Sequence, residues 1–305
     1  MDEFGIIRRY FTRDSRLQGV VVGVGDDGAV LAPTPGLQQV QVIDTLVEGV
    51  HFPSNMEAAD VGYRAVAVNL SDIAAMGAVP RWMTLALTLW DKDEPWVESF
   101  ADGLFAAASE HDVALVGGDT TQGDVVVATV HVTGEVAEDQ VLLRSGAKIG
   151  DGVFVTGTVG DAMAGLKLIE AGRHDDHLVS RFLRPAPRIA TGRELAGRAH
   201  SAIDISDGLA GDLRKLLDAS GVGAEIDLGL LPVSEALREQ FPDEALSLAL
   251  TGGDDYELCF TAPATAVSDI EGITAIGEIV AGSDLVCRHD GRVVDVDERG
   301  YRHFA

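Results

Sequence analysis

The chain has 305 residues, of which 46% are hydrophobic, so it can bury a sizeable core, and its length favours two domains over one. It carries 49 acidic and 23 basic residues, which gives a formal net charge of −26. This charge argues against nucleic acid and against an anionic membrane surface as partners. The same excess is typical of salt-adapted surfaces, so it does not by itself indicate metal binding.

The two cysteines, Cys259 and Cys287, lie in apolar strand-like runs without a CxxC neighbour, which argues against a disulfide framework. The N-terminal segment is charged from residue 2 and lacks the apolar core of a signal peptide. No apolar run approaches the roughly 18 residues that a membrane span needs. We therefore expect a cytoplasmic protein with no membrane partner.

A helix is predicted over residues 61–76, with Asp60 as its N-cap and Gly77 at its end. This helix would place Asn69 and Asp72, three residues apart, on one face. The pair is either part of a polar site or an exposed, partly polar helix face.

Strand and helix patterns follow in turn. We predict a strand over 81–90, a helix from Pro95 to residue 112, a strand over 113–118 that leads into the Asp119 turn, and a long alternating strand over 124–136. The three tryptophans, which lie in or beside these elements, are expected in the core rather than as stacking platforms.

The polar, glycine-rich segment 144–152 marks the domain boundary, which we place between 1–146 and 147–305. In the second domain Ser206 is expected to cap a helix over 207–220. Further predicted elements are strands at VFVTG, SAIDI, AEIDL, YELCF and ITAIGEIV, helices over 161–172 and from Arg188, a helix end at Gly221 and a hairpin turn at Asp290-Gly291. A loose internal repeat, VID at 42–44 against AID at 202–204, stays open.

Aspartate recurs in glycine-rich turns, each after an apolar run that we take as a strand: Gly25–Gly28, Gly117–Thr121, Ser206–Gly208 and Gly252–Asp255. Carboxylates at strand ends lie where α/β folds place their ligands. A solvated surface turn is the ordinary explanation of any one of them, because Asp and Gly are common turn residues. Four with the same pattern favour a cage for cations.

One motif is misleading. Residues 23–28 match G-x-G-x-x-G, with Glu48 where a ribose-binding acid would stand. A dinucleotide loop must open a helix, whereas AVLAP follows here, a strand-like run closed by proline. Two aspartates would also face the phosphates, so we reject the match.

The carboxylates suit phosphate chemistry if divalent cations lie between the two. Like charges about 4 Å apart cost roughly 4 kcal/mol at an effective dielectric near 20, so a bare nucleotide would be repelled. Each Mg²⁺ usually takes one or two carboxylates plus phosphate oxygens and water, which implies roughly three or four ions. The candidate ligands are Asp27, Asp44, Asp72, Asp119, Asp204, Asp207 and Asp254.

The chain resembles the bacterial thiamine-monophosphate kinases. The motifs that carry the resemblance occur in the family's order: GVGDDGAVL, DTLVEGVHF, AVNLSDIAAMGAVPRWMTLALTL, LVGGDTTQG, RSGAKIGD, AIDISDGLAGDL and LTGGDDYELCF. Short elements such as GDD and SDGL are shared with aminoimidazole ribonucleotide synthetase, selenophosphate synthetase and the hydrogenase maturation dehydratase. The resemblance implies ATP-dependent phosphorylation of thiamine monophosphate to thiamine diphosphate.

It also implies a fold and a site. The fold would be α/β (α+β), a two-domain aminoimidazole ribonucleotide synthetase-like architecture with mixed sheets packed with helices, in a homodimer. By matching position, several Mg²⁺ ions would be held by Asp27, Asp44, Asp72, Asp119, Asp204 and Asp207, and catalysis would depend on Asp72, Asp119, Asp204 and Asp207. ATP would contact Gly118, Asp119, Arg144 and Ser206, and thiamine phosphate would contact His51 and Asp254.

Two departures from the family stand out. Val42-Ile43 replace a Ser-Thr pair before Asp44, which removes hydroxyl ligands, and Glu298 stands where some members place an aromatic on the substrate. Either Tyr301 replaces this aromatic or no residue does.

Two rival functions are another ATP-using enzyme of the superfamily, of the cyclo-ligase or selenophosphate synthetase type, and a non-catalytic divalent-cation binder. Taken alone, His51 reads as a surface or core histidine and Arg144 as a surface ion-pair partner.

Overall fold

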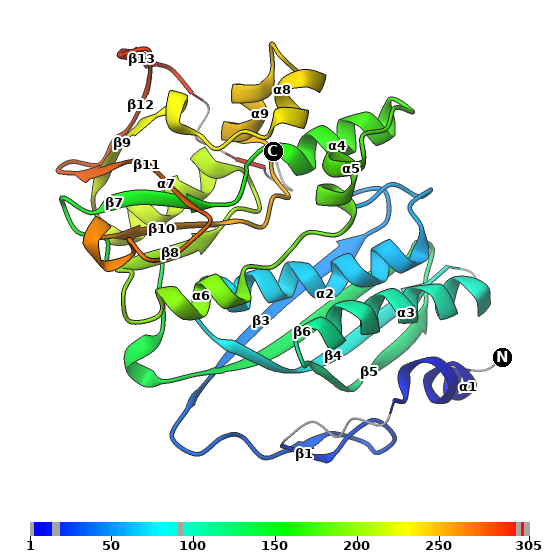
Figure 1. Ribbon diagram of the computed structural model, residues 1–305. Helices are drawn as coiled ribbons and strands as arrows, with labels where there is room; N and C mark the ends of the chain where they lie inside the picture. The colour runs from blue at the N-terminus through cyan, green and yellow to red at the C-terminus, as the bar shows by residue number, and fades with distance from the viewer. Residues whose placement is uncertain (1–2, 14–18, 91–93, 297–299, 302–305) are drawn as a thin grey trace. The chain divides into compact units, whose positions relative to one another are not determined.

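The structure is a computed structural model that describes residues 3–13, 19–90, 94–296 and 300–301. The chain divides into two compact units (Figure 1). The N-terminal unit comprises Met1–Ile73 and Ala78–Glu138, and the C-terminal unit comprises Ala74–Gly77 and Asp139–Ala305. Among the described residues, no helix is long and apolar enough to cross a membrane.

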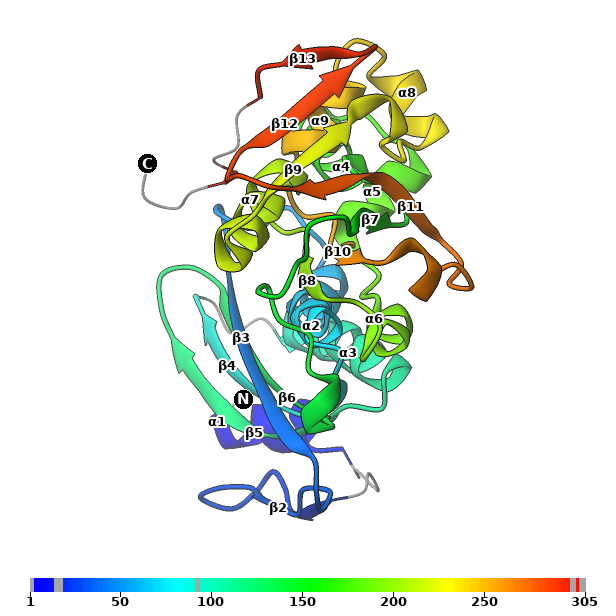
Figure 2. The ribbon, with the colours of Figure 1, turned by 90° about the vertical axis from the view of Figure 1, so that its left-hand side faces the viewer.

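The N-terminal unit is a four-stranded sheet with two long helices on one face (Figure 2). The strand order is β3-β6-β4-β5; β3 and β4 pair antiparallel with β6, and β4 pairs parallel with β5. Its elements are α1 (Glu3–Ile6), η1 (Ile7–Phe11), β1 (Val20–Val22), β2 (Val30–Leu31), β3 (Gln38–Val47), α2 (Ala58–Ala75), β4 (Val79–Leu89), α3 (Glu94–Glu110), β5 (Ala114–Gln122) and β6 (Val127–Val136). The short helix η2 (Glu138–Gln140) begins at the last residue of this unit and continues into the C-terminal unit.

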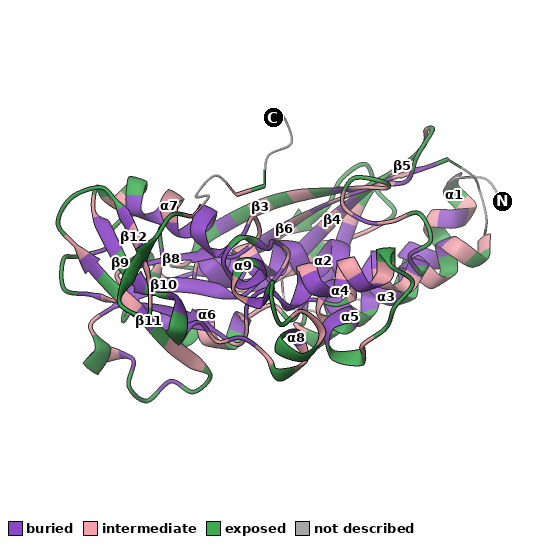
Figure 3. Cartoon of the chain, turned by 90° about the horizontal axis from the view of Figure 1, so that it is seen from above, coloured by how far each residue is buried: buried purple, intermediate pink, exposed green. Residues whose placement is uncertain are grey.

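Two glycines let α2 and α3 cross closely. A Cβ at Gly62 would overlap the Phe100 carbonyl, and one at Gly103 would overlap the Ala59 carbonyl. Most side chains of α2 are buried, and Val66, Leu70 and Ile73 have no exposed surface. By contrast, most of β3 is exposed or half-buried (Figure 3).

The C-terminal unit is built on a seven-stranded mixed sheet in the order β13-β12-β9-β11-β7-β10-β8. All its pairs are antiparallel except β12 with β9. Its elements are β7 (Gly152–Thr156), α4 (Asp161–Glu170), α5 (Asp176–Leu183), α6 (Ile189–Leu195), β8 (Ser201–Asp204), α7 (Leu209–Ser220), β9 (Gly223–Asp227), η3 (Leu228–Leu230), α8 (Glu235–Gln240), α9 (Ala245–Thr251), β10 (Leu258–Ala262), η4 (Ala264–Ala266), β11 (Ile273–Val280), β12 (Leu285–His289) and β13 (Arg292–Val294).

Several predicted boundaries are wrong. Helix α2 begins at Ala58, so Asp60 lies in its first turn rather than at its N-cap. Ser206 does not cap α7, whose N-cap is Gly208, with no side-chain cap. Asp119 lies inside β5 rather than in a turn after a strand. The run before Gly252 is a helix, α9, and the turn leads into β10 instead of following a strand.

Candidate active site

The predicted metal ligands of the N-terminal unit lie on separate elements. Asp44 is in β3 and Asp119 in β5, the two edge strands of the sheet. The register aligns Asp119 with Ala86, Thr129 and Thr45, one row beyond Asp44. With strands about 4.8 Å apart, three steps separate the two edges by about 14 Å. The sheet of this unit therefore does not bring Asp44 and Asp119 together.

Asp27 and Asp72 have different surroundings. Asp27 is exposed in the turn between β1 and β2, and its N–H donates to Asp26 Oδ1 at 2.8 Å. Asp72 is half-buried on α2, one turn after Asn69, which is fully buried. The Asn69 amide donates to the Ala65 carbonyl at 3.0 Å, whereas its Oδ1 finds no hydrogen-bond partner among the described residues. A buried oxygen without a hydrogen-bond partner destabilises the folded state, so such an oxygen calls for an explanation. Asn69 Oδ1 is therefore a candidate ligand-binding atom one helical turn before Asp72.

His51 has a defined tautomer. Its Nδ1 accepts the N–H of Val47 at 3.0 Å, within the turn that follows β3. In the neutral ring the proton is therefore on Nε2, which makes that atom a hydrogen-bond donor. Such a donor suits a phosphate oxygen.

The C-terminal unit brings together two of the predicted turns. The Asp254 N–H donates to the Ser206 carbonyl at 2.9 Å, and the Tyr256 N–H donates to the Ile205 carbonyl at 2.9 Å. A Cβ at Gly253 would lie 2.5 Å from the Ser206 carbonyl oxygen, so only glycine fits there. Asp254 lies almost 50 residues after Ser206 and Asp207 in the sequence. These hydrogen bonds nevertheless bring the three residues together in one assembled junction.

Three other predicted site residues, Asp204, Arg144 and Tyr301, also lie in the C-terminal unit. Asp204 ends β8 and is 4% exposed, paired with Leu258 of β10. Arg144 is exposed, and its carbonyl accepts the Ser220 hydroxyl at 3.1 Å. Tyr301 is 54% exposed, and its N–H donates to the Asp207 carbonyl at 3.2 Å. Glu298 lies outside the described residues.

Asp212 and Lys215 of α7 hold the Ser206–Asp207 turn, and sequence reasoning missed both. Asp212 Oδ2 accepts the N–H groups of Ser206 and Asp207, each at 2.9 Å. Lys215 Nζ donates to Asp207 and to Asp212. Burial raises the pKa of the Asp212 carboxyl, although its bonds with Lys215 lower it. An aspartate five residues after Asp207, with a lysine three residues later, was the available signal.

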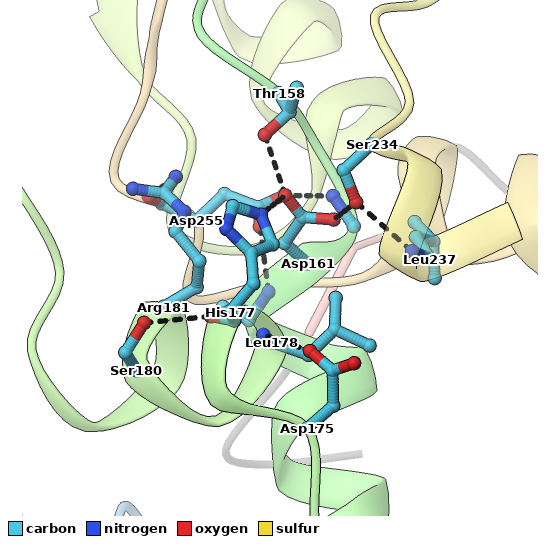
Figure 4. A network of polar contacts seen from close by, with 12 residues as sticks. Thr158, Asp161, Asp175, His177, Leu178, Ser180, Arg181, Ser234, Leu237 and Asp255 are labelled. Carbon is cyan, nitrogen blue, oxygen red and sulfur yellow. Dashed lines mark hydrogen bonds and ion pairs between the residues drawn. The ribbon is translucent and has the colours of Figure 1, made fainter. Parts of the chain in front are cut away.

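A buried polar network supports the residues after Asp254 (Figure 4). The Asp255 carboxylate accepts the N–H groups of Gly160 and Ala162, at the start of α4, at 2.5 and 3.1 Å. Burial raises the pKa of Asp255 to about 8, against the lowering by these two bonds. Asp161 beside it accepts hydrogen bonds from Thr158, His177 and Ser234, which Figure 4 shows pointing at its carboxylate.

Glu257 is the other buried carboxylate of this segment. It binds Arg188 through both oxygens, Arg181 at 2.7 Å and the Thr156 hydroxyl at 2.5 Å. Arg181 also donates to the Asp255 carbonyl at 3.1 Å. Asp254 and Tyr256, which flank Asp255, have positive φ values of 71° and 52°. The hydrogen bonds of Asp255 and Glu257 hold the backbone in this uncommon conformation.

The described residues include no group of three His, Cys, Asp or Glu side chains arranged to hold a metal ion. The site residues are therefore carboxylates at separate places in each unit, plus one assembled junction of Ser206, Asp207 and Asp254.

Comparison with known proteins identifies two domains. The family model "AIR synthase related protein, N-terminal domain" matches residues 25–136, and its C-terminal counterpart matches residues 148–290. Thiamine-monophosphate kinase of Escherichia coli (strain K12) is 48% identical over 322 residues, covering 99% of this chain and 98% of that protein. The enzyme of Bacillus subtilis (strain 168) is 35% identical and covers all of both chains.

Solved structures agree. Thiamine-monophosphate kinase from Stenotrophomonas maltophilia K279a has a TM-score of 0.84 at 42% identity, covering 95% of this chain and 96% of that one. "AaThiL complexed with AMPPCP and TMP" has a TM-score of 0.82 at 32% identity, covering 99% and 96%. The hydrogenase maturation protein HypE of E. coli shares the fold at 20% identity, with a TM-score of 0.81 and coverage of 98% and 97%. The expected two-domain α/β fold is confirmed.

Proposed function

The chain belongs to the thiamine-monophosphate kinases of the AIR synthase related family, and from that membership we propose that it transfers the γ-phosphoryl group of ATP to thiamine monophosphate. The observation that carries this proposal is the 48% identity along almost the whole chain. A relative with the same fold was solved with AMPPCP and TMP bound, which supports the same pair of ligands here.

Magnesium is part of the proposal. The proposed site residues suit magnesium because their carboxylate oxygens are the ligands that this ion prefers. One of them, Asp207, already binds a cation in this structure, the ammonium of Lys215. Bound magnesium would neutralise phosphate charge during transfer. The proposed ligands are Asp27, Asp44, Asp72 and Asp119 in the N-terminal unit and Asp204 and Asp207 in the C-terminal unit.

A general base is not needed. The acceptor is a phosphate with a second pKa near 6, so it is largely anionic at neutral pH. The chain's own task is then to hold donor and acceptor in line and to exclude wrong geometries. Asp72, Asp119, Asp204 and Asp207 are the residues we assign to that task.

For ATP we propose contacts from Gly118, Asp119, Arg144 and Ser206. Arg144 is exposed and can reach a ligand, and Arg suits phosphate oxygens because it binds them bidentately. The Ser206 side chain belongs to a turn whose backbone is fixed by Asp212.

For thiamine phosphate we propose His51, Asp254 and Tyr301. The Nε2–H of His51 would donate to the phosphate. Asp254 carries a negative charge suited to the cationic thiazolium ring. Tyr301, exposed beside Asp207, would supply the aromatic surface that Glu298 lacks.

We also propose a cytoplasmic homodimer that associates through the N-terminal sheets. Ile43 on the edge strand β3 is 63% exposed, an apolar side chain that a second sheet would cover. Both cysteines are buried and neither belongs to a disulfide, in keeping with a reducing compartment.

A coupled ADP assay tests the function. We expect magnesium-dependent ADP formation that requires thiamine monophosphate. ADP release with aminoimidazole precursors or selenide and none with thiamine monophosphate would favour the superfamily rival. Metal binding without any turnover would favour the cation binder.

A further inference from the structure

Lys215 joins two carboxylates of the C-terminal unit. Its Nζ donates to Asp207 Oδ2 at 2.5 Å and to Asp212 Oδ1 at 2.8 Å. The two ends of this bridge differ, because the Asp212 side chain is 1% exposed and the Asp207 side chain is 30% exposed. Asp212 is also fixed by the N–H groups of Ser206 and Asp207. Only the Asp207 end is open to exchange of its partner.

An ammonium on Asp207 opposes a metal ion at the same oxygen. Both are cations that need the lone pairs of Oδ2, and their charges repel at short range. The ammonium can withdraw from Asp207 and still keep its bond to buried Asp212. Nothing in α7 has to unfold for this exchange.

We propose that Lys215 is the resident counter-cation of Asp207: it holds this carboxylate in place before a divalent cation arrives, and it retains only Asp212 afterwards. This inference rests on the proposed function, because it takes Asp207 as a magnesium ligand. Lys215 is thus a positioning residue that lowers the intrinsic metal affinity of the turn while keeping its carboxylate oriented.

The test is binding of Mn²⁺ alone, followed by electron paramagnetic resonance, to the full-length chain and its variants. Lys215→Met and Lys215→Gln remove the ammonium, and the second keeps a hydrogen-bond donor in case the first folds poorly. We expect both to bind Mn²⁺ about two- to fivefold more tightly, the size that a partly exposed ion pair implies.

Lys167→Met is the matched control. Lys167 is 40% exposed against 39% for Lys215, lies in the same unit, and pairs with Glu244 at 2.6 Å, so its loss changes the net charge equally. We expect wild-type affinity from it. We also expect Lys215→Met to lower the thermal midpoint without Mn²⁺. Saturating Mn²⁺ should narrow that gap, because the variant binds Mn²⁺ more tightly, but not close it, because the bond to Asp212 stays lost.

Unchanged or weaker Mn²⁺ binding by both Lys215 variants would overturn the inference, as would equal tightening by Lys167→Met. Asp207→Asn distinguishes failure of the counter-cation role of Lys215 from failure of the ligand role of Asp207. If this variant loses affinity while the Lys215 variants match wild type, only the counter-cation inference fails. If it binds Mn²⁺ as wild type does, the proposed ligand role of Asp207 fails with it.

Discussion

The N–H of Asp254 donates a hydrogen bond of 2.9 Å to the carbonyl of Ser206, which ties the proposed substrate-binding turn to the proposed nucleotide-binding turn. The backbone of Asp254 has a φ of 71°, a region that Asn and Asp tolerate better than most residues. The two turns are therefore one rigid surface, and a change of charge at Asp254 can be made without disturbing its backbone.

Asp254→Asn tests the charge. Because Asn accepts the same φ, we expect an unchanged thermal midpoint, and a KM for thiamine monophosphate raised about tenfold through loss of a charge-assisted contact. The KM for ATP should stay within about twofold. Asp290→Asn is the control, since Asp290 also has a positive φ, 49°, in a hairpin turn. An equal rise in both KM values would contradict a substrate role.

Asp207→Asn and Asp72→Asn test the metal ligands. We expect turnover to fall about 100-fold or more, because several kcal/mol of charge stabilisation would be lost, at 1.36 kcal/mol for each tenfold. Folding should suffer little, because Asp72 is only half-buried and the ion pair of the 30% exposed Asp207 with Lys215 is worth little. Asp218→Asn on α7 is the matched control, an exposed carboxylate paired with Arg214. Near-normal turnover, or joint collapse of turnover and thermal midpoint, would argue against the role.

Local signals predicted several elements well. Strand β11 runs over Ile273–Val280 as expected from ITAIGEIV, and Gly221 ends α7 with a φ of 68°. The Asp290-Gly291 turn joins β12 to β13 with both φ values positive, as a two-residue hairpin requires. Each of these depends on a few neighbouring residues.

Contacts between residues far apart in the chain could not be predicted from local sequence patterns. Asp255 satisfies N–H groups at Gly160 and Ala162, 95 and 93 residues away, and Glu257 binds Arg188 69 residues away. LALTG has the composition of a strand but forms the end of α9, because short apolar runs do not distinguish the two. Asp212, rather than Ser206, supplies the acceptor before α7, and only its spacing from Asp207 and Lys215 could have indicated this.

The pKa of Asp255 predicts a pH effect on stability. Burial raises it to about 8, whereas an unfolded Asp titrates near 3.9. Between these values the folded state binds more protons, so the free energy of unfolding falls as the pH rises from about 4 to 8 and levels off above. Thermal midpoints of wild type and Asp255→Asn should therefore converge or cross as the pH rises from 5 to 8.5. Parallel profiles would contradict the assignment.

Val42 and Ile43 predict a weak metal position beside Asp44. Both lie in β3, where Ile43 is 63% exposed, and neither side chain has an atom that can ligate an ion, so the ion must rely on the Asp44 carboxylate, backbone carbonyls and water. Replacing them by Ser and Thr should lower the magnesium concentration for half-maximal activity and leave the KM for ATP similar. An unchanged or higher magnesium requirement would remove part of the claim of Asp44 as a ligand.

The most direct measurement of the central claim is ³¹P NMR of the chain with ATP, Mg²⁺ and thiamine monophosphate. We expect the two coupled phosphorus signals of thiamine diphosphate to appear in an amount equal to the ADP formed, with no excess of inorganic phosphate. ADP and inorganic phosphate in equal amounts, without thiamine diphosphate, would show hydrolysis rather than transfer and would contradict it.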